Sequence, residues 1–138
     1  MKELYLDANI FLNYWFDEFS KTAEAYYAQQ LFNRALGCEF SFVITTLVLD
    51  ELSSRSGLSV EEINEKWFPM LTRSGKVRIE GISQEVIDGA VRLERTFHIP
   101  RKDAIHASFC LMNNLAIITR DRHFLSIASL KVLVPEDL

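Results

Sequence analysis

Five short apolar or β-branched segments alternate with longer segments of helical periodicity, and this alternation is the strongest constraint on the fold. The strand-like segments are residues 4–6, 40–45, 77–79, 115–119 and 132–134. Helical spacing of apolar residues covers residues 20–36, 47–55, 60–73, 84–97 and 102–113. Because connections of this length are crossovers rather than hairpins, the pattern predicts an α/β fold, an αβα sandwich with a central, mostly parallel sheet of about five strands.

The rest of the sequence favours one domain over residues 1–138. Hydrophobic residues make up 49% of the chain, and no Pro-, Gly- or Ser-rich linker interrupts it. About two thirds of the extended-chain surface can be buried at this length, so a core forms without disulfides. We expect Cys38 and Cys110 to be free, buried thiols. Without a signal peptide or an apolar run of roughly 18 residues, the chain is expected to be cytoplasmic, with no membrane contact.

Four acidic residues stand where a parallel sheet would bring them together. Asp7 ends the first predicted strand, Glu51 follows the second by one to two helical turns, and Asp121 follows the fourth. Asp103 opens the helix that runs into that fourth strand. Ligands of such sheets bind outside the carboxyl ends of the strands. Each acid alone is explained equally well as a helix cap, a first-turn residue or a solvated charge, but four together would repel each other unless cations lay between them.

This clustering predicts a metal site. Its ligands would be oxygen atoms only, because the His and Cys residues are not spaced as they are in zinc-binding motifs. Oxygen ligands favour Mg²⁺ or Mn²⁺. One or two such ions would activate water and neutralise charge on a phosphate, so the predicted reaction takes place at a phosphoryl group. The net charge of −4 argues against a nucleic-acid partner, yet four metal ligands would leave 15 acidic against 15 basic side chains.

The order of these motifs resembles that of PIN domains. The residues that carry the resemblance are Asp7-Ala8-Asn9 after a strand, Thr45 six positions before Glu51, Asp103-Ala104-Ile105-His106-Ala107, and Ile118-Thr119-Arg120-Asp121 with Phe124. The resemblance covers nearly the whole chain, and the small size is similar to that of the VapC-type toxin ribonucleases of bacterial and archaeal toxin-antitoxin pairs. It implies an αβα sandwich, a Mg²⁺- or Mn²⁺-dependent endoribonuclease and a cognate antitoxin.

The resemblance also implies roles for individual residues. Catalysis and metal binding would belong to the four acids, Asp7, Glu51, Asp103 and Asp121. Supporting positions, where an amide or hydroxyl orients a carboxylate or a water, would be Asn9, Thr45 and Thr119.

One position departs from the family pattern. Two residues after Asp121, where many relatives have a further acid, this chain has His123. Without that acid the family's fifth ligand is missing. His123 is open to two interpretations, a phosphate contact or an exposed histidine without a role.

Two neighbours of the acids need separate interpretation. Asp50 competes with Glu51, because adjacent helical residues point about 100° apart and only one can face the strand ends. The apolar positions leave this choice open, and the spacing from Thr45 favours Glu51. His106, one turn after Asp103, is expected to be packed and hydrogen-bonded, with an active-site role as the alternative.

Contacts with substrate and partners are less well determined. Cations flank the acids and either pair with RNA phosphates or are solvated, namely Arg101, Lys102, Arg120 and Arg122. A dense apolar run follows Asp7-Ala8-Asn9 and consists of Phe11, Leu12, Tyr14, Trp15, Phe16 and Phe19. Exposed aromatic residues typically mark interfaces, and the resemblance suggests a homodimer and an antitoxin groove; complete packing into the core is the alternative.

Two other functions compete with the nuclease. Haloacid-dehalogenase-like phosphatases also have an Asp after the first strand, but their second Asp is a general acid, and Asn9 at that position cannot donate a proton in that role. A catalytically degenerate domain that keeps the fold and binds a partner protein is the third possibility. The presence of all four acids favours the nuclease.

Overall fold

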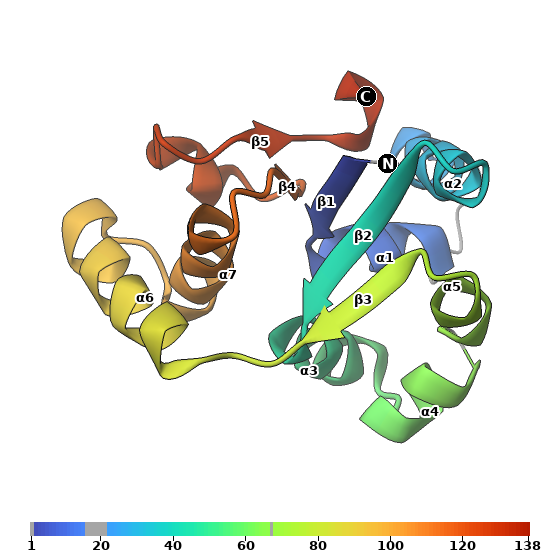
Figure 1. Ribbon diagram of the computed structural model, residues 1–138, viewed down its shortest axis with the longest axis horizontal. Helices are drawn as coiled ribbons and strands as arrows, with labels where there is room; N and C mark the ends of the chain where they lie inside the picture. Colours follow the sequence, from blue (N-terminus) through green and yellow to red (C-terminus); the bar gives the residue numbers. More distant parts are fainter. Residues whose placement is uncertain (1, 16–21, 67) are drawn as a thin grey trace.

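The computed structural model describes residues 2–15, 22–66 and 68–138, and its five strands form one parallel sheet (Figure 1). The strands are β1 (Lys2–Leu6), β2 (Phe40–Thr45), β3 (Val77–Glu80), β4 (Ile117–Ile118) and β5 (Val132–Leu133). Their order in the sheet is β3-β2-β1-β4-β5. The α/β fold with a parallel, five-stranded sheet is therefore confirmed.

The central strand β1 fixes the register of the sheet. Leu4 of β1 lies opposite Phe42 of β2, and Tyr5 lies opposite Ile117 of β4. All of these side chains are buried, because β1 and β2 are covered by helices on both faces and carry apolar residues at successive positions. The core therefore lies on both sides of β1.

The helices divide between the two faces of the sheet. They are α1 (Ala8–Trp15), α2 (Ala23–Leu36), α3 (Thr46–Ser56), α4 (Val60–Lys66), α5 (Pro69–Arg73), α6 (Gln84–Phe97) and α7 (Arg101–Met112), with short 3-10 turns η1 (Arg122–Ser126) and η2 (Pro135–Asp137). The chain steps outward from β1 to β3 and then returns past β1 to β4. Because crossovers are right-handed, this reversal leaves α1 to α5 on one face and α6 with α7 on the other (Figure 1).

The reversal of direction also locates the binding edge. The connection after β1 leads toward β2, whereas the connection after β4 leads toward β5. Adjacent parallel strands whose connections diverge leave a crevice at their carboxyl ends, where ligands of open α/β sheets bind. Asp7 and Thr119 are the first residues beyond β1 and β4 at this crevice.

The helices of the structure differ from the prediction in two places. Residues 60–73 form two helices instead of one, because Pro69 lacks a backbone N–H and begins the second, α5. Residues 8–15, for which no helix was predicted, form α1. The first of the two helices in residues 60–73, α4, starts after a capping box, in which the Ser59 hydroxyl accepts from the backbone N–H of Glu62 and the Glu62 carboxylate accepts from the N–H of Ser59.

The aromatic run after the first motif packs inward in its described part. Phe11 is fully buried, and its ring lies 5.4 Å from that of Phe32 and 5.3 Å from that of Phe68. Leu12, Tyr14 and Trp15 are partly buried against the core. Phe16 and Phe19 lie outside the described residues. The four described members are therefore explained by packing rather than by an exposed interface.

Both cysteines are free, as predicted, but only one is buried. Cys110 lies in the core on α7. Cys38 is exposed in the turn after α2, with a positive φ of 69°, so the prediction of burial was wrong for this residue. Turn geometry between α2 and β2 decides its exposure.

Helices α6 and α7 approach so closely that Gly89 has no space for a side chain. A Cβ there would lie 2.4 Å from Oγ of Ser108, which donates a hydrogen bond of 2.7 Å to the carbonyl of Val86. We expect Gly89→Ala to lower the free energy of unfolding by about 1–3 kcal/mol, despite the gain of about 1 kcal/mol in helix propensity. Urea unfolding measures this. The double variant with Ser108→Ala should recover part of the loss, and a Gly89→Ala protein as stable as wild type would contradict the packing argument.

Candidate metal centre

Asp7 is the buried centre of the candidate site. Its carboxylate Oδ1 accepts a hydrogen bond of 2.7 Å from the backbone N–H of Ala8, and Oδ2 accepts one of 2.7 Å from the hydroxyl of Thr119. The amide of Asn9 donates to both Oδ2 of Asp7 and the Thr119 hydroxyl, each at 3.3 Å. Only 5% of Asp7 is exposed, and burial raises its pKa, with the Glu51 charge acting in the same direction.

Thr119 links the loop after β1, which carries Asp7, to the loop after β4, which carries Asp121. Besides donating to Asp7, its hydroxyl accepts a hydrogen bond of 3.0 Å from the backbone N–H of Asp121. Asn9 accepts from the backbone N–H of Arg120 at 3.3 Å. Asn9 and Thr119 therefore contact the predicted ligands directly and fix the loop after β4 against the loop after β1.

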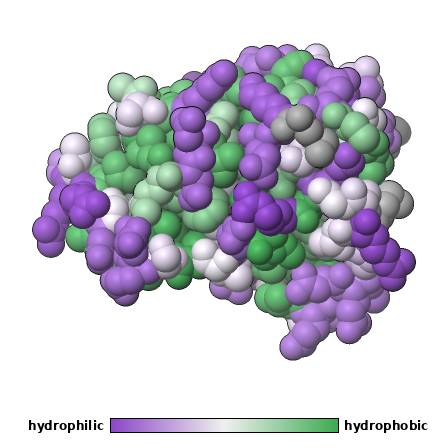
Figure 2. Space-filling model, in the orientation of Figure 1, coloured by the Kyte–Doolittle hydropathy of each residue, from purple (hydrophilic) through white to green (hydrophobic). Residues whose placement is uncertain are grey.

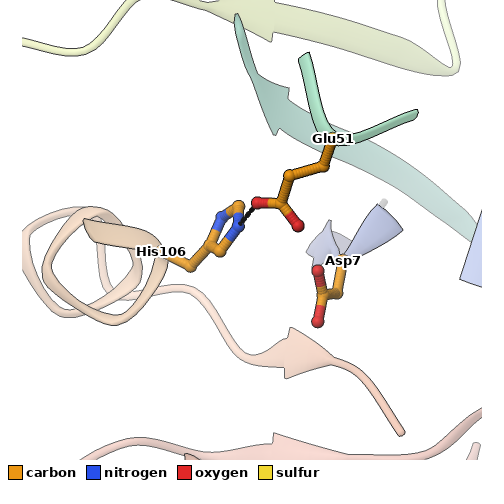
Figure 3. Close-up of side chains that lie close together, drawn as sticks. All are labelled: Asp7, Glu51 and His106. Carbon is orange, nitrogen blue, oxygen red and sulfur yellow. Dashed lines mark hydrogen bonds and ion pairs between the residues drawn. The ribbon is translucent and has the colours of Figure 1, made fainter. Parts of the chain in front are cut away.

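Glu51 is oriented by a buried chain of polar side chains. Nε2 of His106 contacts Oε1 of Glu51, as Figure 3 shows beside Asp7. On the other side of the ring, Nδ1 of His106 lies 2.5 Å from the hydroxyl of Tyr5, which is 2.9 Å from Oγ1 of Thr45. Burial raises the pKa of Tyr5 well above its ordinary value, so its hydroxyl keeps its proton. Thr45 thus reaches the site through Tyr5 and His106.

The two adjacent acids of α3 differ in exposure and direction. Glu51 is half-buried and points toward the strand ends, whereas Asp50 is exposed. His106, only 1% exposed, is packed and hydrogen-bonded as expected, and it also lies in the site. Burial alone would lower the pKa of His106, but the contact with Glu51 and the charge of Asp7 raise it.

The other two acids meet at His123. Its Nδ1 lies 2.9 Å from Oδ2 of Asp103 and 3.3 Å from Oδ1 of Asp121, and its backbone N–H donates to Oδ1 of Asp121 at 2.9 Å. The hydrogen bond to Asp103 and the charge of Asp121 raise the pKa of His123. Burial raises the pKa of Asp103, as do the charges of Asp121 and Asp7.

These acids therefore form two adjacent groups at one edge. The first consists of Asp7, Glu51 and His106, and the second of Asp103, Asp121 and His123; within each group the candidate ligand atoms all lie within 4.8 Å of one another. The charge of Asp7 acts on Asp103, and Thr119 joins Asp7 to the loop of Asp121 by hydrogen bonds. All four predicted acids are thus brought to one place.

The four flanking cations divide into two pairs. Arg120 forms a bidentate ion pair with Glu136, at 2.5 and 2.8 Å, and Arg101 donates to Glu94 at 2.6 Å. Lys102 and Arg122 are exposed and have no ion pair with any other residue that the structure describes. A cavity of about 580 Å³ adjoins Asp121 and is lined in part by Arg120, Arg122 and Glu136.

The residues of the two groups fit a divalent cation. Burial raises the pKa of Asp7 and of Asp103, the Glu51 charge adds to the rise at Asp7, and the charges of Asp121 and Asp7 add to it at Asp103, so a hard cation would compensate the clustered charge. The fold also places the ring nitrogens of His106 and His123 beside these carboxylates, in addition to the oxygen atoms that the sequence predicts. Their partners are distant in sequence, so spacing rules for zinc motifs did not detect them.

The sequence contained a weak signal for Tyr5, which the sequence analysis missed, and for His106, whose role it left open. Tyr5 precedes Asp7 by two positions, and alternate strand residues point to the same face. His106 follows Asp103 by three positions, which is one helical turn. Each spacing predicts proximity to an acid, but only the fold shows that Tyr5 and His106 contact each other.

Comparison with known proteins gives the family. The family model described as PIN domain matches residues 4–130, so the chain belongs to the PIN-domain family. A search of curated proteins finds no match.

Several solved structures have the same fold as this chain. The chain is 22% identical to a "Toxin-antitoxin complex from Klebsiella pneumoniae", with a TM-score of 0.65, covering 96% of this chain and 97% of that one. It is 17% identical to FitAcB from Neisseria gonorrhoeae (TM-score 0.70, covering 98% and 99%). It is 18% identical to VapBC2 from Rickettsia felis bound to a promoter DNA fragment (TM-score 0.63, covering 94% and 96%). At these identities the likeness establishes the fold.

No helix within residues 2–15, 22–66 and 68–138 is both long enough and apolar enough to cross a bilayer.

Burial of the Asp7 charge should be measurable as a pH-dependent cost in stability. A carboxyl whose pKa is raised on folding stabilises the fold below its unfolded pKa, near 3.8, and that contribution is lost as pH rises through the folded pKa. In EDTA we therefore expect Asp7→Asn to be at least as stable as wild type at pH 7, with the difference shrinking as pH falls toward 4. Urea unfolding across this range tests it. The exposed Asp50→Asn is the control, and a large loss of stability in Asp7→Asn at pH 7 would contradict the argument.

Proposed function

We propose that this protein is a divalent-metal-dependent endoribonuclease that acts as the toxin of a type II toxin-antitoxin pair. The convergence of Asp7, Glu51, Asp103 and Asp121 at the crevice between β1 and β4, in a chain of the PIN family, is the observation that carries this proposal. Phosphodiester hydrolysis fits because carboxylates that gather at close range need cations, and such cations also neutralise a scissile phosphate.

Metal binding and the orientation of the carboxylates would fall to different residues of the site. The four acids would hold Mg²⁺ or Mn²⁺, and the ion supplies activation of water and charge neutralisation at the phosphate when bound. Thr119 and Asn9 hold the Asp7 carboxylate in one orientation through their hydrogen bonds. His106 does the same for Glu51, with Tyr5 behind it.

RNA would approach beside Asp121. Lys102 and Arg122 are exposed cations at this edge and are our candidates for direct phosphate contacts. Arg101 and Arg120 would have to leave Glu94 and Glu136 to bind phosphate, so we expect smaller effects from their substitution.

The proposed partners are a cognate antitoxin and a second copy of the chain, acting in the cytoplasm on cellular RNA. A structural neighbour from Klebsiella pneumoniae is a toxin-antitoxin complex, which supports the antitoxin. Hydrophilic residues separate the apolar areas on the face in Figure 2. The exposed large hydrophobic residues are dispersed over several elements, namely Tyr26, Tyr27, Leu36, Ile79, Met112 and Leu125. Tyr26 and Tyr27 on α2 are adjacent, so α2 is our candidate for a protein contact.

Removal of a single metal-binding carboxylate should abolish cleavage. We expect Asp7→Asn and Asp121→Asn to lower the rate of RNA cleavage at least ~100-fold, because a lost ligand costs at least as much as the 10–100-fold of a lost supporting contact. Cleavage of mixed RNA in Mn²⁺ or Mg²⁺, with EDTA as the metal-free arm, measures this.

The two adjacent acids of α3 provide a matched control. Glu51→Gln should lose activity, while the exposed Asp50→Asn should retain it. Equal loss in both would contradict the assignment of Glu51. Folded wild-type protein that cleaves no RNA with either ion, yet binds an antitoxin, would favour the degenerate binding module.

RNA affinity itself should depend on the ion. Phosphates that enter the apo site meet up to four carboxylates in a partly desolvated crevice, and the net charge of −4 offers little general attraction. We expect wild type in Ca²⁺, as a poorly catalytic ion, to bind labelled RNA more tightly than in EDTA at the same ionic strength. Equal affinity in both would mean that exposed cations such as Lys102 and Arg122 carry the binding alone.

A further inference from the structure

His123 lies between two of the four acids, with its ring nitrogen Nδ1 facing both Asp103 and Asp121. It follows the last acid by two residues, and the 3-10 turn η1 directs its ring back toward α7. The Asp121 carboxylate caps this turn by accepting from the backbone N–H of His123 at 2.9 Å. Loop and ring are therefore held in place by one of the acids that the ring contacts.

The three candidate ligand atoms have the spacing of a coordination shell. Neighbouring ligands around a six-coordinate ion with bonds of about 2.1 Å lie about 3.0 Å apart. Nδ1 of His123 is 2.9 Å from Oδ2 of Asp103 and 3.3 Å from Oδ1 of Asp121, and all three atoms lie within 4.8 Å of one another. Small movements of these side chains would therefore allow one metal ion to replace the proton between Nδ1 of His123 and Oδ2 of Asp103.

The other side of the ring is compatible with this role. His123 has a side chain that is 60% exposed, and Nε2 has no hydrogen-bond partner among the residues that the structure describes. A histidine that binds a metal through Nδ1 keeps its proton on Nε2, where solvent can accept it. Solvent is available there, so no buried donor is left unsatisfied.

We propose that Nδ1 of His123 is a metal ligand together with Asp103 and Asp121, and that the site consequently selects Mn²⁺ over Mg²⁺. The proposal rests on the metal site of the proposed function and specifies its ion. Mg²⁺ prefers oxygen ligands and gives up its water reluctantly, whereas first-row transition-metal ions, of which Mn²⁺ is one, accept imidazole more readily. A histidine ligand brings a nitrogen donor in place of an oxygen donor, so it favours Mn²⁺ over Mg²⁺ more than a carboxylate at the same place would.

The direct test is spectroscopic and needs no RNA. Full-length protein loaded with one equivalent of Mn²⁺ should show ¹⁴N coupling in pulsed electron paramagnetic resonance, and His123→Gln should lose or reduce it. Titration should show Mn²⁺ affinity at least about tenfold weaker in His123→Gln, with a smaller change for Mg²⁺. His123→Asp should lose the same coupling and bind Mg²⁺ more tightly than wild type does.

His98→Asn is the matched control, because it removes an exposed histidine at a positive φ that Asn also tolerates, and it should change neither measurement. Wild type without ¹⁴N coupling would overturn the proposal, as would coupling unchanged in His123→Gln, which would indicate His106 instead. The proposed function is judged separately by RNA cleavage: protein with the His123 coupling but no cleavage retains the ligand and loses the nuclease.

Discussion

Asp7 buries a carboxylate at the carboxyl end of the central strand, and the site is built around holding it there. Its three donors come from Ala8, Asn9 and Thr119, so the loops after β1 and β4 are joined through one side chain. Burial raises the pKa of Asp7, and the Asp7 charge adds to the rise that burial and Asp121 cause at Asp103. The cost in stability of burying the Asp7 charge falls at the crevice where the connections after β1 and β4 diverge, which is where an α/β sheet binds ligands.

Each acid is held by a different part of the molecule. Glu51 depends on a histidine whose far side is fixed by Tyr5 and, through it, by Thr45. Asp121 is held by the Thr119 hydroxyl and by the turn that it caps itself. Such supports would orient the carboxylates before a metal binds and would lower the ordering cost of its binding.

The order of strands and helices could be predicted because short apolar segments and helical periodicity are local properties. The four acids could also be predicted as neighbours, since parallel strands end at the same edge. Three details could not. Pro69 divides a predicted helix, Cys38 is exposed by its turn, and the aromatic residues around Phe11 face Phe32 and Phe68. Each depends on backbone geometry or on packing partners that are distant in sequence.

The sequence by itself determined the class of fold and the four carboxylates of the site, because strand ends and helix starts are readable from local patterns. Tertiary structure decided which groups meet them. His106 and His123 join the acids only because α7 and the turn after β4 converge on the end of β1. Arg101 is paired with Glu94 where α6 meets α7, and Arg120 is paired with Glu136 where the loop after β4 meets η2. A contact between side chains far apart in the chain depends on the packing of whole elements, and residue spacing does not encode it.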